Sequence, residues 1–225
     1  MHRIAIDPVL SERLMAQRGG RLHLVDRIDA ARTAHVVIDM QNGFMEPGAA
    51  VETPMARAIV PNVNIIASAV RDAGGTNIFV RFATPVEALD SWSTFYARFP
   101  EPMRKAHQEA FAPGAHGWEL WPGLDVRTQD LIIDKKRFGA FIPGTCDLHD
   151  ILQARGIDTV IITGTLSNVC CESTARDAMQ MNYGVVFVAD ANAARTDADH
   201  NNTLNTLCAL FADVMTTKEV VGAIG

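Results

Sequence analysis

The stretch DTVIITGTLSNVCCESTARDAMQMNYGVVFVAD, residues 158–190, decides the fold, because it holds a strand, a helix and a second strand in succession. Residues 158–164 and 185–190 are short apolar runs rich in β-branched side chains, which is typical of buried strands. The amphipathic stretch between them, around residues 170–182, predicts a helix. Such a unit places its two strands in parallel within one sheet.

The same alternation extends outward in both directions from this stretch. Further strands are expected at residues 34–40, 76–82 and 130–135, with a short last one in DVMTT at 213–217, and further helices around residues 60–75, 146–156 and 199–212. Strands that are almost continuously apolar are buried on both faces. The sequence therefore predicts a three-layer α/β/α fold around a six-stranded, mostly parallel sheet.

In this chain of 225 residues we expect one large domain at residues 34–225. An arm whose periodicity is weak precedes it at residues 1–33. One segment interrupts the alternation: residues 83–128 are rich in Trp, Phe, Pro and His. A long irregular insertion of this kind forms either the wall or lid of a site or an oligomer contact.

Composition narrows the range of partners. The net charge of −6 provides no broad basic surface for nucleic acid, and no apolar run is long enough to span a membrane. The first residues interrupt their apolar side chains with charges too often for a signal peptide, so we expect a cytoplasmic protein that acts on a small molecule. The four cysteines lack metal-type spacing and are expected to be reduced thiols.

Polar residues that follow apolar strands indicate the site, because ligands bind at the carboxyl ends of parallel strands. Asp39 follows one predicted strand, Lys135 ends another, and the loop GTLSNVCCES follows a third. Taken alone, Asp39 could be a turn residue and Lys135 a solvated strand end. Together, an acid, a base and a thiol at three strand ends could converge on one pocket.

Cys170 lies after a glycine-containing turn and at the expected start of a helix. The positive end of a helix favours the thiolate, which is the attacking form of cysteine. Most isolated cysteines are simply buried small hydrophobic residues, so position alone does not settle the role. Cys171 competes for it, but on a helix it points about 100° away from its neighbour.

Three segments taken together resemble the isochorismatase-like cysteine hydrolases: VVIDMQNGFMEPG at 36–48, DKKRFGAFIPGTCDL at 134–148 and ITGTLSNVCCESTARDAMQMNYGVVFVADANAA at 162–194. They occur in the order found in that family, so the resemblance covers about residues 34–217. Within the amidohydrolase branch of the family, residues 164–179 look most similar to ureidoacrylate amidohydrolases.

The resemblance implies a role for several residues. The family's catalytic aspartate falls on Asp39, its lysine on Lys135 rather than Lys136, and its nucleophile on Cys170, which is followed by one variable residue and then Glu-Ser-Thr. A cis peptide is implied between Thr165 and Leu166. The backbone N–H groups of Leu166 and Cys170 would then form the oxyanion hole.

The implied reaction is hydrolysis of the C–N bond of a small amide, ureido or carbamoyl compound through a cysteine thioester. The alternatives are isochorismatase-type cleavage of a vinyl ether and a catalytically silent, oligomeric binding protein on the same fold. Nicotinamidase-type relatives hold a metal near the end of the second strand. Residues 81–92 contain no histidine, so neither a metal nor another cofactor is expected.

Substrate contacts are expected from residues near the predicted strand ends and in the insertion. The candidates are Gln41, Asn42, Phe44, Arg81, Trp92, Tyr96 and Phe138. Their aromatic side chains would form a wall, and Arg81, Arg98 or Arg137 would pair with a substrate carboxylate. Relatives commonly form dimers or tetramers, so a homo-oligomer is also expected.

Overall fold

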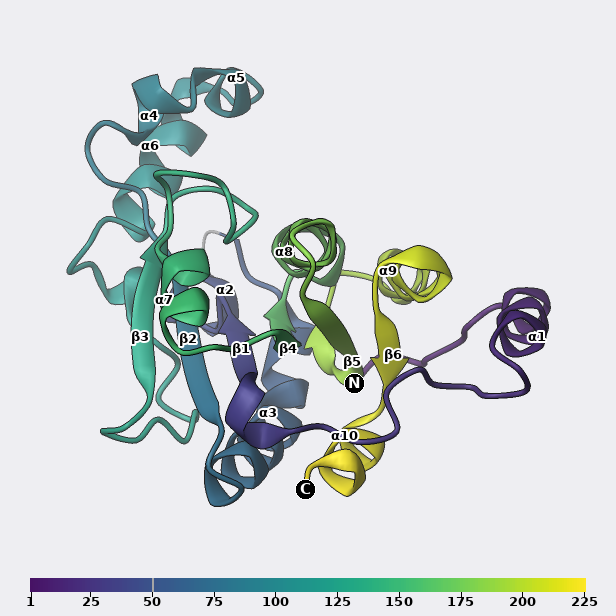
Figure 1. The fold of residues 1–225 in the computed structure, drawn as a ribbon. Helices are drawn as coiled ribbons and strands as arrows, with labels where there is room; N and C mark the ends of the chain where they lie inside the picture. The colour runs from purple at the N-terminus through teal and green to yellow at the C-terminus, as the bar shows by residue number, and fades with distance from the viewer. Residues whose placement is uncertain (50) are drawn as a thin grey trace.

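The computed structural model describes residues 1–49 and 51–225, which fold around one sheet of six strands (Figure 1). The strands are β1 (Thr33–Ile38), β2 (Thr76–Phe82), β3 (Leu131–Lys135), β4 (Thr159–Thr165), β5 (Gly184–Ala193) and β6 (Asp213–Met215). Every neighbouring pair is parallel. The predicted six-stranded α/β fold is confirmed, and its sheet is parallel throughout.

Helices cover both faces of the sheet. The helices are α1 (Pro8–Gln17), α2 (Asn42–Met45), α3 (Pro54–Asp72), α4 (Ala88–Ser91), α5 (Ser93–Tyr96), α6 (Glu101–Ala110), α7 (Leu148–Ala154), α8 (Glu172–Gln180), α9 (Asp197–Leu210) and α10 (Thr217–Ala223). Helices α7, α8 and α9 share one apolar core with the sheet, and α3 and α10 share the other. Strand β1 supplies both cores because its side chains alternate, with Val36 on one face and Val37 on the other.

Helix α3 shows why the sequence folds in this way. Its buried residues include Ile59, Val63, Ile66 and Val70, which recur every three or four positions and form one apolar face. The helix begins at Pro54, earlier than the periodicity suggested, because proline suits the first helical turn. Burying this face against the sheet stabilises the layer by about 2 kcal/mol per large side chain.

The strands are ordered β3-β2-β1-β4-β5-β6 across the sheet, so the direction in which successive strands are added changes at β1. The chain first adds strands on one side of β1 and then, from β4 onward, on the other. The connections that leave the carboxyl ends of β1 and β4 therefore diverge to opposite sides and open a crevice between them. The functional site is expected at this crevice.

Two segments lie outside this alternation. The arm at residues 1–33 runs along the β6 side of the sheet, where α1 contacts α9 (Figure 1). Helices α4, α5 and α6 fall within the insertion and gather beyond the end of the sheet at β3. Among the residues that the structure describes, no helix is both long and apolar enough to cross a membrane.

Candidate active site

Three strand ends bring the predicted reactive residues together. Lys135 is the last residue of β3, and Asp39 follows β1 directly in a left-handed backbone conformation, with φ of 53°. Asp is one of the few residues besides glycine that adopts this conformation readily. Cys170 follows β4. Residues that are 96 positions apart in sequence, Lys135 and Asp39, thus form one contact.

The contact is a fully buried ion pair. Lys135 Nζ lies 2.8 Å from Asp39 Oδ2, and both side chains are 0% exposed. The ammonium also donates to the carbonyl of Arg137 at 3.1 Å and lies 5.0 Å from the centroid of the Phe82 ring. The second carboxylate oxygen, Asp39 Oδ1, has no hydrogen-bond partner among the described residues. One oxygen thus holds the lysine while the other is left to accept a proton.

The surroundings shift the pKa values of all three groups. Burial raises the pKa of Asp39, although Lys135 and the Cys170 thiol oppose the shift. Burial lowers the pKa of Lys135, but the charges of Asp39 and of the Cys170 sulfur outweigh it and raise the pKa overall. Burial and then the Asp39 charge raise the pKa of Cys170 well above its usual range. The Cys170 thiol is therefore neutral at rest, beside the buried Asp39–Lys135 pair.

The sequence led us to expect a thiolate at the start of a helix, and the structure differs on both points. Cys170 lies in a single π-helical turn, Ser167–Cys171, that precedes α8, and the Cys171 N–H donates to the Leu166 carbonyl at 3.2 Å. The peptide bond between Thr165 and Leu166, singled out from the family resemblance, is cis. Burial outweighs the helix terminus, so the thiol must give up its proton during the reaction.

The two adjacent thiols face different surroundings. Cys170 is 5% exposed and lines a cavity, whereas Cys171 is fully buried and belongs to the apolar core that includes α7, α8 and α9. Burial also raises the pKa of Cys171 well above its usual value. Only Cys170 is therefore in a position to meet a ligand.

A chain of buried hydrogen bonds supports the π-helical turn from behind. The Ser167 hydroxyl donates to Nδ1 of His200 at 2.8 Å, and Nε2 of His200 donates to the carbonyl of Ala189 at 2.9 Å. Burial lowers the pKa of His200 to about 4, which keeps this ring neutral. His2, from the arm, stacks on His200 with ring centroids 4.4 Å apart. The arm thus reaches the back of the turn that carries Cys170.

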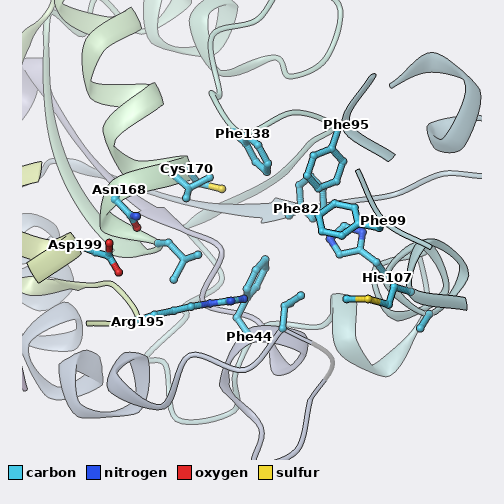
Figure 2. A pocket seen from close by; sticks show the side chains of 15 residues that line it. Phe44, Phe82, Phe95, Phe99, His107, Phe138, Asn168, Cys170, Arg195 and Asp199 are labelled. Carbon is cyan, nitrogen blue, oxygen red and sulfur yellow. The ribbon is translucent and has the colours of Figure 1, made fainter. Parts of the chain in front are cut away.

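The cavity next to Cys170 has a volume of about 550 Å³. It is lined by Phe44, Val51, Phe82, Phe95, Phe99, Met103, Ala106, His107, Phe138, Leu166, Asn168, Val169, Cys170, Arg195 and Asp199. In Figure 2 the Cys170 sulfur points toward a group of rings: Phe82, Phe95, Phe99, His107 and Phe138. Asn168 and Asp199 lie on the other side, and Arg195 extends toward Phe44. The volume suits a small-molecule ligand.

Four of the residues predicted to contact substrate or form the oxyanion hole line this cavity: Phe44, Phe138, Leu166 and Cys170. Gln41 does not. Its amide donates to the carbonyls of Phe82 and Trp118 and accepts from the Phe82 N–H, so it ties β2 to the insertion.

The other four predicted contacts also lie outside the cavity lining. Asn42 donates to the carbonyl of His116, and Arg81 Nε pairs with Asp134 at 2.8 Å. Trp92 and Tyr96 pack behind Phe95, which lines the cavity. The ring centroids of Trp92 and Phe95 are 4.4 Å apart, and those of Tyr96 and Phe95 are 5.0 Å apart. These side chains support the cavity from outside.

Sequence reasoning missed most of the lining. Arg195 and Asp199 follow β5, but that strand was expected to end at Asp190, whereas it continues to Ala193. The rule that ligands bind at strand ends would have found Arg195 had the strand been given its full length. No sequence pattern indicated that side chains from α5 and α6, such as Phe95 and His107, would line the cavity. No group of three His, Cys, Asp or Glu that could hold a metal occurs in the described part of the chain.

Comparisons with known proteins identify a matching family and similar hydrolases. The isochorismatase domain matches residues 33–219. Among curated proteins, ureidoacrylate amidohydrolase RutB from Pseudomonas syringae pv. syringae is 28% identical over 186 residues, which are 73% of this chain and 72% of that protein.

The solved structures that are similar to this chain include a cysteine hydrolase and an amidase. The crystal structure of a cysteine hydrolase from Pseudomonas syringae pv. phaseolicola shares 32% identity and matches with a TM-score of 0.75, covering 87% of this chain and 93% of that one. The N-carbamoylsarcosine amidase from Thermoplasma acidophilum shares 26% identity with a TM-score of 0.65, over 83% of this chain and 96% of that one.

Proposed function

The chain belongs to the isochorismatase family, and on that premise we propose that it hydrolyses the C–N bond of a small amide, ureido or carbamoyl compound through a thioester on Cys170. The observation that carries the proposal is the buried Asp39–Lys135 ion pair next to a thiol that lines a cavity. An ureidoacrylate amidohydrolase and an N-carbamoylsarcosine amidase among the similar proteins support this class of substrate.

The first step is attack by sulfur on the amide carbonyl. The Cys170 thiol passes its proton to Asp39, whose Oδ1 is without another partner, as the S–C bond forms. Lys135 keeps its proton and stabilises the negative charge that develops on the sulfur. Because all three groups are buried, these charges interact strongly.

The tetrahedral intermediate carries its negative charge on the former carbonyl oxygen. The N–H groups of Leu166 and Cys170, two residues that line the cavity, would hold this oxyanion, and each such donor is worth about 3 kcal/mol in other enzymes. Asp39 then gives its proton to the leaving nitrogen as the C–N bond breaks. Ammonia or an amine leaves, and the acyl group stays on sulfur.

Water completes the cycle. Asp39, again a carboxylate, accepts a proton from a water molecule that attacks the thioester. The C–S bond breaks, the carboxylic acid leaves, and the proton returns from Asp39 to the Cys170 sulfur. No group beyond the three side chains and the two backbone donors is needed.

A carboxylate on the substrate would meet Arg195 rather than Arg81. Arg195 lines the cavity beside Phe44 and apart from Phe95 and Phe99 (Figure 2), whereas Arg81 is paired with Asp134 and stacked over the Trp118 ring at 3.5 Å. A guanidinium matches a carboxylate with two hydrogen bonds. An acidic ureido or carbamoyl compound therefore suits the polar side of the cavity.

The test is release of ammonia from a panel of amide, ureido and carbamoyl compounds, with the Cys170→Ala variant as control. We expect turnover by the wild type, loss of at least about 10³-fold in the variant, and an acyl-enzyme adduct on Cys170 by mass spectrometry. Unchanged turnover by Cys170→Ala would refute the mechanism. If that variant cleaved a vinyl ether instead, Asp39 would be acting as an acid without the thiol.

A further inference from the structure

The three short helices of the insertion form one side of the cavity. Phe95 comes from α5, Phe99 lies between α5 and α6, and Met103 and His107 come from α6. These helices stand beyond the end of the sheet (Figure 1). Apart from His107, the residues of this segment that line the cavity are apolar. We call this set, together with Phe138, the aromatic wall.

The rings of the aromatic wall hold one another in place. The Phe95 ring lies edge-on to Phe138 and to Phe99, with centroid distances of 5.2 Å in both cases and interplanar angles of 87° and 70°. Trp92 packs against Phe138 from outside, with centroids 4.7 Å apart. Edge-to-face contacts of this kind are favourable and fix ring orientation. The wall is therefore preformed to pack against the aromatic ring of a ligand.

His107 adds a ring to the wall without adding a charge. Burial lowers its pKa to about 4, so the imidazole is neutral at physiological pH. Its Nδ1 lies 3.2 Å from the Tyr96 hydroxyl, and its centroid is 5.6 Å from that of Phe82. The polar lining residues Asn168 and Asp199 lie on the opposite side of Cys170, and Arg195 extends toward Phe44 (Figure 2).

A compact ureido acid uses only the polar side of such a cavity. It would leave the phenylalanines in contact with water, at a cost of about 25 cal/mol for each Å² of apolar surface left unburied. The cavity volume of about 550 Å³ lies well inside the range of sites for drug-sized ligands, about 300–1,000 Å³. Room remains beside the scissile bond for a large apolar group.

We propose that the amide cleaved by this protein carries an aromatic or comparably bulky apolar substituent, which packs among Phe95, Phe99 and Phe138. This inference rests on the proposed amide hydrolysis and adds the class of substrate. The wall then selects substrates by the surface they bury, and Cys170, between the apolar and polar sides of the cavity, attacks the carbonyl.

The experiment compares 3-phenylpropanamide with propanamide, which differ only in the phenyl ring. Binding is measured by calorimetry on the Cys170→Ala protein, and ammonia release is measured on the wild type. We expect the aromatic amide to bind at least about tenfold tighter and to have the lower KM. Phe99→Ala should remove most of this preference by raising the KM for 3-phenylpropanamide, while Phe99→Leu should restore part of it.

Phe211→Ala is the matched control, because Phe211 is also half-buried but packs under Arg176, outside the cavity lining. Equal binding of the two amides, or an equal loss in Phe99→Ala and Phe211→Ala, would overturn the inference. Tighter binding of the aromatic amide without ammonia release from any amide would instead count against the hydrolase proposal and leave the aromatic site standing.

Discussion

The two sides of the candidate site are built in different ways. Asp39 and Lys135 are fully buried at strand ends of the sheet and depend on each other, whereas Phe95 and Phe99 are half-buried in the segment of short helices outside the layered fold. The reactive groups are therefore part of the core, and the aromatic wall is attached to it. Reactivity and selectivity can accordingly be altered separately, with very different effects on stability.

The largest effect is expected where the ion pair is broken. Asp39→Ala leaves a buried ammonium without its partner, and we expect the free energy of unfolding to fall by about 3–5 kcal/mol, measured by urea denaturation. Phe99→Ala should cost about 1 kcal/mol or less, because its site is half-exposed. The double variant Asp39→Leu/Lys135→Met should recover part of the stability. Equal losses in Asp39→Ala and Phe99→Ala would contradict the comparison.

Gly164 is the next most sensitive position. Its φ of +122° is one that other residues rarely adopt, and a Cβ built there would lie 2.1 Å from the carbonyl oxygen of Ile38, one residue before Asp39. Gly164→Ala should therefore destabilise the protein by about 3 kcal/mol or more. Gly144→Ala is a control for the dihedral alone, because its φ is +72° but nothing lies near a new Cβ. Equal losses would mean that close packing at β1 is not the cause.

The pH dependence tests the strand-end side of the site. Asp39 must be ionised to accept the thiol proton, and burial raises its pKa, so kcat/KM should fall on acidification through a midpoint above the ordinary aspartate value of about 3.9. Well below that midpoint the loss is about tenfold per pH unit. Because the pKa of Lys135 is also raised, it does not limit activity near neutral pH. Phe99→Ala should leave the midpoint unchanged, and a shift would contradict the separation of the two sides.

The smallest effect is expected in the arm. His2→Ala removes the stack on His200 and the 2.7 Å contact with Asp197, which should cost about 1 kcal/mol and lower kcat modestly through the turn that carries Cys170. Arg3→Ala is the control, because Arg3 is exposed and is held through its backbone carbonyl by Asn201. A change in KM alone after His2→Ala would assign the arm to substrate binding instead.

The sheet and the reactive cluster were accessible from sequence for the same physical reason. Buried parallel strands are continuous apolar runs, and the polar residues that end them, such as Asp39 and Lys135, stand out against that background. Because the strands are parallel, both residues lie at the same edge of the sheet; that they meet depends on the strand order β3-β2-β1, which apolar patterning does not predict. The family resemblance then distinguished Cys170 from Cys171.

The aromatic wall was not accessible in this way. Residues 88–110 include three short helices whose mutual packing depends on ring contacts. No regular spacing of apolar residues therefore predicted them. Gln41 and Arg81 were expected to contact substrate because they lie near strand ends, yet their polar groups are engaged by Phe82, Trp118 and Asp134. Position along a strand indicates which edge a residue lies on, but not whether its side chain is free.

Trp92 packs directly behind two residues of the cavity lining, with its ring 4.4 Å from Phe95 and 4.7 Å from Phe138 by centroid distance. The sequence contains three tryptophans, and the other two are Trp118 and Trp121. With those two replaced by phenylalanine, the emission of Trp92 would report occupancy of the cavity directly. The protein thus carries an intrinsic fluorescent probe, with which ligands can be screened by titration independently of turnover.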